Sequence, residues 1–146
     1  MNRYPIWKYV IIAVALVIGH ELAHNALGHL DAQKKNQAVG MLGGLLVDVA
    51  IAAAGGGVGS DFTRLGGQIG AAAYSKQFEA EADYAGMYFI ARANFKLDGV
   101  ENVWRKFALD YPSGINFGGG HPTTPERYLS IAAARDEIRA AQAAGL

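Results

Sequence analysis

The sequence contains no cysteine among its 146 residues, so neither a disulfide framework nor a thiolate metal site can form. Any bound metal must therefore be held by histidine, aspartate or glutamate. The formal net charge is zero, which gives no indication of a nucleic-acid surface. The sequence also shows no P-loop, no dinucleotide fingerprint and no convincing alternation typical of a β-strand. The chain is long enough for one domain with a real core.

Apolar periodicity predicts a mostly α-helical chain, which we take as a single domain over residues 1–146. A capping signal at Ser60 or Asp61 predicts one short helix. The other expected elements are a helix over about 8–30, the polar break DAQKKNQ, a Gly/Ala-rich helical arm over about 37–59, helices over about 75–93 and 98–109, a Gly/Pro-rich loop over about 110–123, and a C-terminal helix over about 124–143.

Two apolar runs leave alternatives open. The run over residues 9–19 resembles a signal peptide, but no small-residue cleavage site follows it. It also meets Glu21 before the ~20 apolar residues of a membrane span are complete, so the buried first half of a helix is an equal alternative. The run over residues 40–59 could be a packed hairpin arm or could touch a membrane. We favour packing, because glycine and alanine suit close helix contact and Asp48 is hard to place in lipid.

The stretch GHELAHNALGH contains the pattern H-E-x-x-H. On a helix, His20 and His24 point within about 40° of each other and can share a single zinc ion. Glu21 points about 100° away from His20, which suits a base that takes a proton from a metal-bound water. The alternative is a buried helix with polar residues on its wet side. His29 would lie about 180° from His20, so we expect a surface or capping histidine there.

A third ligand is expected from a second helix that carries the stretch SKQFEAEADYAG. Glu79 and Asp83 are four residues apart and share a face, whereas Glu81 lies about 200° round from Glu79. If Glu79 binds the metal, Asp83 can accept an N–H from a ligand histidine and fix its tautomer. The small residues Ala82 and Gly86 would let the two helices approach closely. The alternative is a solvated acidic face at the start of a helix.

The blocks GHELAHNALGH, SKQFEAEADYAG and HPTTPER resemble the three signature blocks of the HtpX and CAAX-prenyl-protease family of gluzincin zinc metallopeptidases. The closest likeness is to its bacterial envelope branch. The resemblance implies a zincin-like helical core with one zinc ion held by His20, His24 and Glu79. It also implies Glu21 as the catalytic base and Asp83 as the supporting aspartate.

The third block, HPTTPER, follows a run of three glycines that lets the loop swing. In similar proteins the histidine of this block approaches the zinc. The resemblance therefore implies that His121 is a removable fourth ligand or a donor to the tetrahedral oxyanion. Arg127 is expected to hold a carboxylate near the site, either Asp83 or Glu126. The alternative is that His121 and Pro122 merely begin a helix.

The resemblance implies a zinc metalloendopeptidase that acts in quality control of unfolded or membrane-associated polypeptides. It also implies a bacterial envelope location, with possible peripheral membrane contact, and the balanced charge leads us to expect no nucleic-acid partner. Family members normally carry further strands before the zinc helix. Only about eight residues precede that helix here, so we expect an N-terminally truncated gene product that lacks those strands. The alternative function is a catalytically impaired zinc-binding fragment or interaction module.

Overall fold

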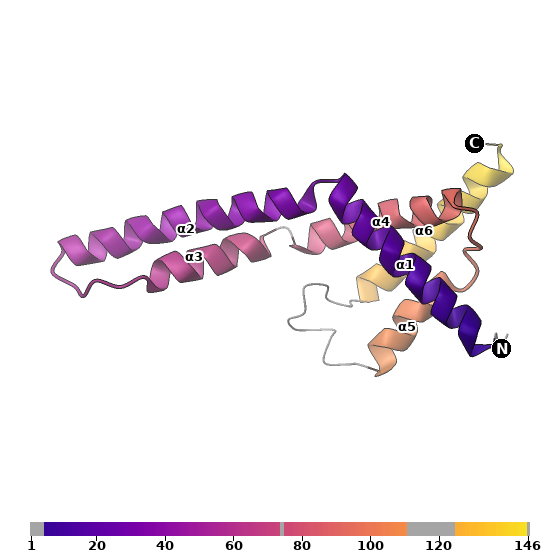
Figure 1. Ribbon diagram of the computed structural model, residues 1–146, viewed down its shortest axis with the longest axis horizontal. Helices are drawn as coiled ribbons and strands as arrows, with labels where there is room; N and C mark the ends of the chain where they lie inside the picture. The colour runs from indigo at the N-terminus through magenta and orange to yellow at the C-terminus, as the bar shows by residue number, and fades with distance from the viewer. Residues whose placement is uncertain (1–4, 74, 111–124, 146) are drawn as a thin grey trace. The chain divides into compact units, whose positions relative to one another are not determined.

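The computed structural model describes residues 5–73, 75–110 and 125–145. No strand occurs in these ranges, so the prediction of a mostly α fold is confirmed. The helices, shown in chain order in Figure 1, are α1 (Ile6–Ala26), α2 (His29–Ala53), α3 (Asp61–Ala72), α4 (Ser75–Arg92), α5 (Val100–Asp110) and α6 (Pro125–Ala143). The Gly/Pro-rich loop lies outside the described residues, apart from Asp110, which ends α5.

The chain divides into two compact units. The first comprises Met1–Leu27 and Glu79–Leu146, and the second comprises Gly28–Phe78. The first unit therefore holds α1, most of α4, α5 and α6, and the second holds the α2–α3 hairpin and the first turn of α4. That the chain acts as a single peptidase domain stays a prediction.

The first helix ends earlier than predicted. The Leu27 amide donates to the Ala23 carbonyl at 2.9 Å, and Gly28 has a left-handed φ of 70°. Glycine adopts this conformation without the steric cost that a side chain adds, so the chain turns at Gly28. A new helix then begins at His29 and runs through DAQKKNQ. The predicted polar break is wrong, because residues 31–37 belong to α2, where most of them are exposed.

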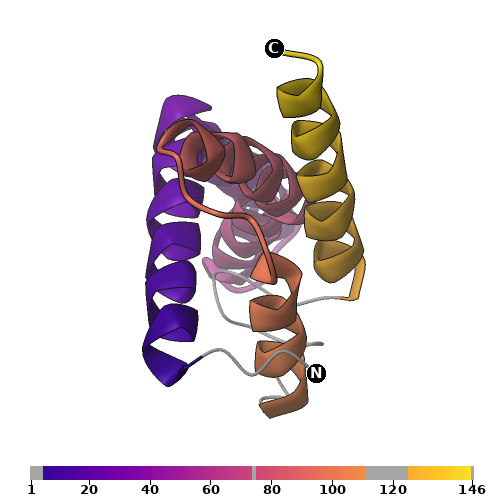
Figure 2. The same ribbon diagram turned by 90° about the vertical axis from the view of Figure 1, so that its right-hand side faces the viewer.

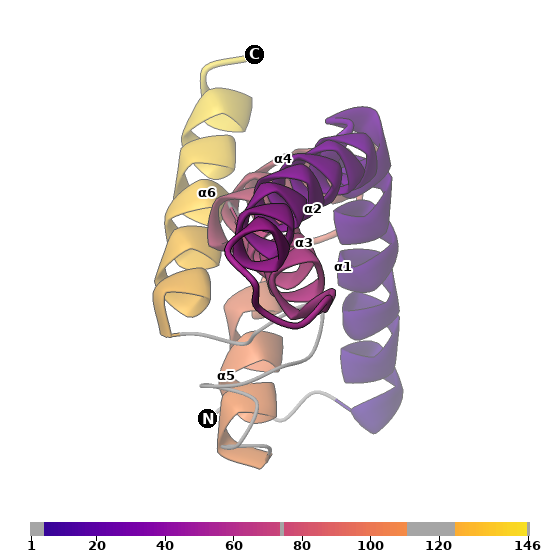
Figure 3. The same cartoon turned by 90° about the vertical axis from the view of Figure 1, so that its left-hand side faces the viewer.

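In the first unit, α4 lies between α1 and α6, as Figure 2 shows and Figure 3 shows from the opposite side. The helices α1 and α4 cross at Gly19 and Gly86, where a Cβ on Gly19 would lie 2.9 Å from the Gly86 carbonyl oxygen. Buried apolar side chains from four helices and from the α4–α5 connection form the core of this unit. They are Ala15, Leu16, Met87, Ile90, Leu97, Val100, Val103, Ile131, Ala134 and Ile138.

In the second unit, α2 and α3 form an antiparallel hairpin with glycine at the contact (Figure 1). A Cβ added at Gly40 would collide with the carbonyl of Gly66, and one added at Gly44 would collide with the carbonyl of Phe62. The backbones of the two helices therefore touch directly. The expected packing of the Gly/Ala-rich arm is confirmed, and its partner is α3.

Asp48 of α2 caps the N-terminus of α3. Its carboxylate accepts from the Phe62 amide at 3.3 Å, the Thr63 amide at 2.8 Å and the Thr63 hydroxyl at 2.6 Å. Ser60 occupies the N-cap position but makes no side-chain cap hydrogen bond. The predicted helix start is therefore correct, but the predicted capping group is wrong. The capping carboxylate comes from the neighbouring helix, where it is buried.

Candidate metal centre

Helix α1 turns two histidines to the same side. His20 and His24 are 7% and 8% exposed, and their ring centroids lie 4.5 Å apart. Their two Nε2 atoms are separated by 3.0 Å. Both buried imidazoles thus converge on one point, as the four-residue spacing predicts. Glu21, between them in sequence, is exposed.

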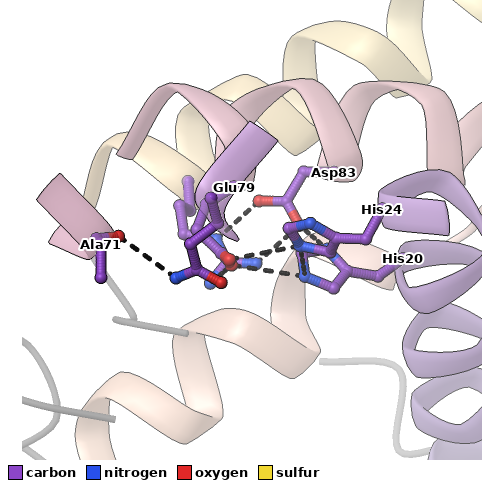
Figure 4. A network of polar contacts seen from close by, with 7 residues as sticks. His20, His24, Ala71, Glu79 and Asp83 are labelled. Atoms are coloured by element: carbon purple, nitrogen blue, oxygen red, sulfur yellow. Dashed lines mark hydrogen bonds and ion pairs between the residues drawn. The ribbon is translucent and has the colours of Figure 1, made fainter. Parts of the chain in front are cut away.

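Helix α4 adds a carboxylate to the same point (Figure 4). Glu79 Oε2 lies 3.3 Å from His20 Nε2, and Glu79 Oε1 lies 3.2 Å from His24 Nε2. One possible ligand atom from each of the three residues lies within 4.8 Å of the other two. A tetrahedral zinc with bonds of about 2.0–2.1 Å requires ligand atoms about 3.3 Å apart. The three side chains therefore fit a zinc ion in both donor type and spacing; their role as ligands stays a prediction.

Asp83 orients one of these histidines from one turn along α4. Its Oδ1 atom accepts from Nδ1 of His20 at 2.9 Å. With Nδ1 engaged as the donor, the other ring nitrogen, Nε2, is directed at His24 and Glu79. This carboxylate–histidine arrangement is the one that metal sites use to fix the tautomer and raise the basicity of a ligand imidazole.

Arg127 of α6 holds both carboxylates. Its Nε and Nη2 atoms donate to Asp83 at 2.6 and 2.7 Å, and its Nη1 atom lies 3.1 Å from Glu79 Oε2. Of the two partners predicted for Arg127, Asp83 is therefore present, and the side chain of Glu126 lies outside the described residues. The contact with Glu79 was not predicted. All three side chains are buried, so the guanidinium offsets charge that water cannot screen.

The surroundings of His20 favour a positive charge. Burial acts to lower its pKa, but the hydrogen bonds and negative charges of Asp83 and Glu79 outweigh this and raise the pKa from 6.5 to about 9. In the metal-free protein a bound proton supplies this positive charge on the His20 ring. A divalent cation bound to Nε2 of His20 would also supply positive charge there, which agrees with the presence of His24 and Glu79 beside that nitrogen.

The sequence contains two other histidines, His29 and His121. His121 lies outside the described residues, so its approach to the metal stays a prediction. His29 is buried at 4% exposure in the second unit, where its ring stacks on Phe78 with the planes 14° apart. The prediction of a surface position for His29 is therefore wrong. The turn at Gly28 places it on α2 rather than on the helix of His20.

Sequence reasoning missed Gly19, although a signal was available. It named Gly86 as a point of close approach but no matching residue on the His20 helix. Gly19 directly precedes His20 and packs its backbone against Gly86. A glycine inside an otherwise continuous apolar helix indicates a close backbone contact, and this one lies beside the ligands.

A helix with H-E-x-x-H whose histidines meet a glutamate of a second helix is the arrangement of a metallopeptidase centre. The sequence pattern of Peptidase family M48 matches residues 12–135 of this chain. The chain therefore belongs to peptidase family M48, which confirms the predicted family at this level. The narrower likeness to the HtpX and CAAX-prenyl-protease type stays a prediction.

The chain is 35% identical over 132 residues to the Metalloprotease LoiP of Escherichia coli (strain K12). The match covers 87% of this chain and 50% of that protein, so the chain spans about half the length of the relative. No solved structure matches the chain.

Proposed function

We propose that this chain is a zinc-dependent metalloendopeptidase. The observation that carries the proposal is the convergence of His20, His24 and Glu79 on one buried point, with Glu21 exposed beside them. A purely structural zinc site has no use for a glutamate at that position. Membership of peptidase family M48 and the likeness to a metalloprotease support the same function.

In this proposal His20, His24 and Glu79 hold the zinc. The bound ion supplies a water of lowered pKa and an electrophile for the scissile carbonyl oxygen. Glu21 accepts a proton from the water while the water oxygen bonds to the carbonyl carbon of the substrate. The protonated Glu21 then gives that proton to the amide nitrogen, so that the C–N bond breaks and a neutral amine leaves. No covalent enzyme intermediate forms.

The remaining residues position these groups. Asp83 holds the ring of His20, and Arg127 holds Asp83 and Glu79 in place. We assign His121 to the oxyanion, as a donor or a removable fourth ligand, on the strength of the family's third sequence block.

For substrate we propose unfolded or membrane-associated polypeptides, with quality control in the bacterial cell envelope as the setting. The support is an apolar stripe on the exposed side of α1. These side chains are between 48% and 57% exposed: Trp7, Val10, Ile11, Val14, Val17, Ile18 and Leu22. An apolar surface of this kind suits chains that display their own hydrophobic residues. Such a setting also agrees with α2, the one helix in the described ranges long and apolar enough to cross a membrane.

A second candidate is a zinc-binding fragment or interaction module without peptidase activity. It is compatible with the same convergence of His20, His24 and Glu79, because a zinc ion can be held there whether or not a polypeptide is cleaved. The two candidates share the metal centre and differ in whether a polypeptide is cleaved.

Cleavage of unfolded casein by the zinc-loaded chain separates the candidates. Glu21→Gln removes the proposed base and keeps the ligands, whereas Glu81→Gln makes the same change at an exposed carboxylate of α4. We expect cleavage by the wild type and by Glu81→Gln, and loss of at least about two orders of magnitude in Glu21→Gln. Zinc binding without cleavage in all three proteins supports the module. Equal cleavage by all three overturns the assignment of Glu21.

A further inference from the structure

The α2–α3 hairpin has its small residues inside and its large apolar residues outside. In water, helices associate by burying large apolar side chains between them, because this removes apolar surface from solvent. Here the contact is made by Gly40 and Gly44 of α2 and by Gly66 and Gly70 of α3. We call the large side chains on the outside the apolar outer surface: Val39, Leu42, Leu45, Leu46, Val49, Phe62, Leu65 and Ile69.

This surface is exposed far beyond what a water-soluble helix pair requires. Leu46 is 72% exposed, Leu42 62% and Val39 61%. Only 11% of the apolar window of α2 is buried. A helix that is apolar nearly all round is typical of a protein core or of a membrane, whereas a solvent-facing helix carries one apolar stripe. Association through glycine, in a G-x-x-x-G spacing on both helices, is the mode that helices use in lipid.

The polar groups of the hairpin are compatible with contact with lipid. Asp48, the only charged residue between positions 36 and 60, is buried and accepts three hydrogen bonds from the start of α3. Most backbone groups nearby are bonded within their own helices. The remaining charges lie in two places. Asp31, Lys34 and Lys35 precede the apolar run on α2, and Asp61 pairs with Arg64 at 3.7 Å in the first turn of α3.

We propose that the α2–α3 hairpin is a lipid-binding element whose apolar outer surface enters the acyl chains of a phospholipid bilayer. The helix α2 has 25 residues and is about 37 Å long at 1.5 Å per residue. In this proposal the polar residues of α3, Asp61, Arg64 and Gln68, stay at the headgroups, as polar residues do in helices that lie in the membrane interface. The structure shows the packing alternative for this segment on its inner side, and the proposal assigns the membrane alternative to its outer side.

The absence of cysteine allows this proposal to be tested with single labels. Leu46→Cys, on the apolar outer surface, carries an environment-sensitive nitrobenzoxadiazole dye. The full chain is mixed with vesicles of phosphatidylethanolamine and phosphatidylglycerol, some with brominated acyl chains. We expect a blue shift and quenching by the brominated lipid for the label at 46, and neither for a label at Gln142→Cys on α6. A label at Val14→Cys tests α1 instead, and a response there without one at position 46 overturns the proposal.

A paired variant tests the same surface without a label. Leu42→Gln with Leu46→Gln changes two exposed side chains, so the fold is expected to survive, as circular dichroism and zinc content can verify. We expect vesicle flotation to fall by about tenfold or more, since two leucines leave the bilayer. Wild-type protein that does not float, or a variant that floats equally, overturns the proposal. Oligomerisation that occurs without lipid and fully accounts for the shielding of position 46 also overturns the proposal. That result would assign the apolar outer surface to contact with a second copy of the chain.

The lipid proposal is independent of the proposed peptidase function. The Glu21→Gln protein, with its base removed, is expected to float with vesicles as the wild type does. Flotation without casein cleavage therefore counts against the peptidase alone, and cleavage without flotation counts against the lipid-binding element alone.

Discussion

Gly19 of α1 and Gly86 of α4 lie in backbone contact, directly beside the candidate metal ligands. A Cβ on Gly86 would lie 3.0 Å from the amide nitrogen of His20 and 3.1 Å from the carbonyl oxygen of Gly19. Both neighbours are backbone atoms and cannot rotate away. The distance between the helix that carries the histidines and the helix that carries Glu79 is therefore set by the absence of two side chains.

Gly86→Ala is expected to weaken zinc binding by about tenfold, or about 1.4 kcal/mol, because the two helices must move apart by a few tenths of an ångström. Overpacking of this kind also lowers the free energy of unfolding by about 1–3 kcal/mol. Helix propensity alone predicts the opposite, a gain of about 0.5–1 kcal/mol on replacing glycine by alanine. Competition with a chromophoric chelator and unfolding in urea measure the two effects. Gly43→Ala is the control, because a Cβ there meets nothing within 4 Å. Unchanged zinc affinity in Gly86→Ala would refute the spacing role.

Asp83→Asn is expected to lower zinc affinity by about 10- to 100-fold, as loss of a ligand's supporting carboxylate does elsewhere. The amide cannot supply the negative charge that holds Nδ1 of His20 as a donor, and its NH2 group replaces one of the two oxygens that accept from Arg127. Isothermal titration with zinc, on protein first stripped by chelator, gives the affinity. Glu81→Gln serves as the exposed control on the same helix. An affinity equal to wild type would show that Asp83 supports only the fold.

The candidate site could be predicted largely because the residues of each pair lie close together in the sequence. The spacings of His20 to His24 and of Glu79 to Asp83 are both four residues, and helix geometry alone places each pair on one face. The second contact of Arg127, with Glu79, depends on how α6 packs against α4. Such packing is decided by many side chains at once and leaves no short motif.

The errors in the predicted fold have related causes. The segment DAQKKNQ is polar because it is exposed, and exposure does not end a helix, whereas Gly28 does. The cap of α3 was sought next to the helix in sequence, at Ser60 or Asp61. The group that caps it, Asp48, lies on another helix, and its role becomes visible only when α2 and α3 pair.

The stability of the zinc-free protein is expected to fall as pH rises from 6.5 to about 9. His20 has a pKa of about 9 in the folded chain against 6.5 for an ordinary histidine. The folded state therefore binds the proton more tightly, so this contribution is complete below pH 6.5 and is lost as pH passes the folded-state pKa. Thermal unfolding in the presence of a chelator measures the slope, and His20→Gln should remove it. A wild-type profile no steeper than that of His20→Gln would contradict the expectation.

Asp48→Ala is expected to lower the free energy of unfolding of the hairpin by about 1–2 kcal/mol, because the first amides of α3 lose their acceptor. Hydrogen exchange followed by mass spectrometry reports this as faster exchange confined to α3. Ser60→Ala is the matched control and should change little, since Ser60 makes no side-chain cap hydrogen bond. If Ser60→Ala matched the effect of Asp48→Ala, the cap would have been assigned to the wrong residue.

The metal content of the purified chain tests the central claim most directly. Wild type, Glu79→Gln, Glu21→Gln and Glu81→Gln are each stripped, incubated with zinc, desalted and measured by atomic emission. We expect about one zinc ion per chain in wild type, Glu21→Gln and Glu81→Gln, and loss of bound zinc in Glu79→Gln, which keeps its size but loses its charge. Full zinc in Glu79→Gln, or none in the wild type, would contradict a centre built from His20, His24 and Glu79.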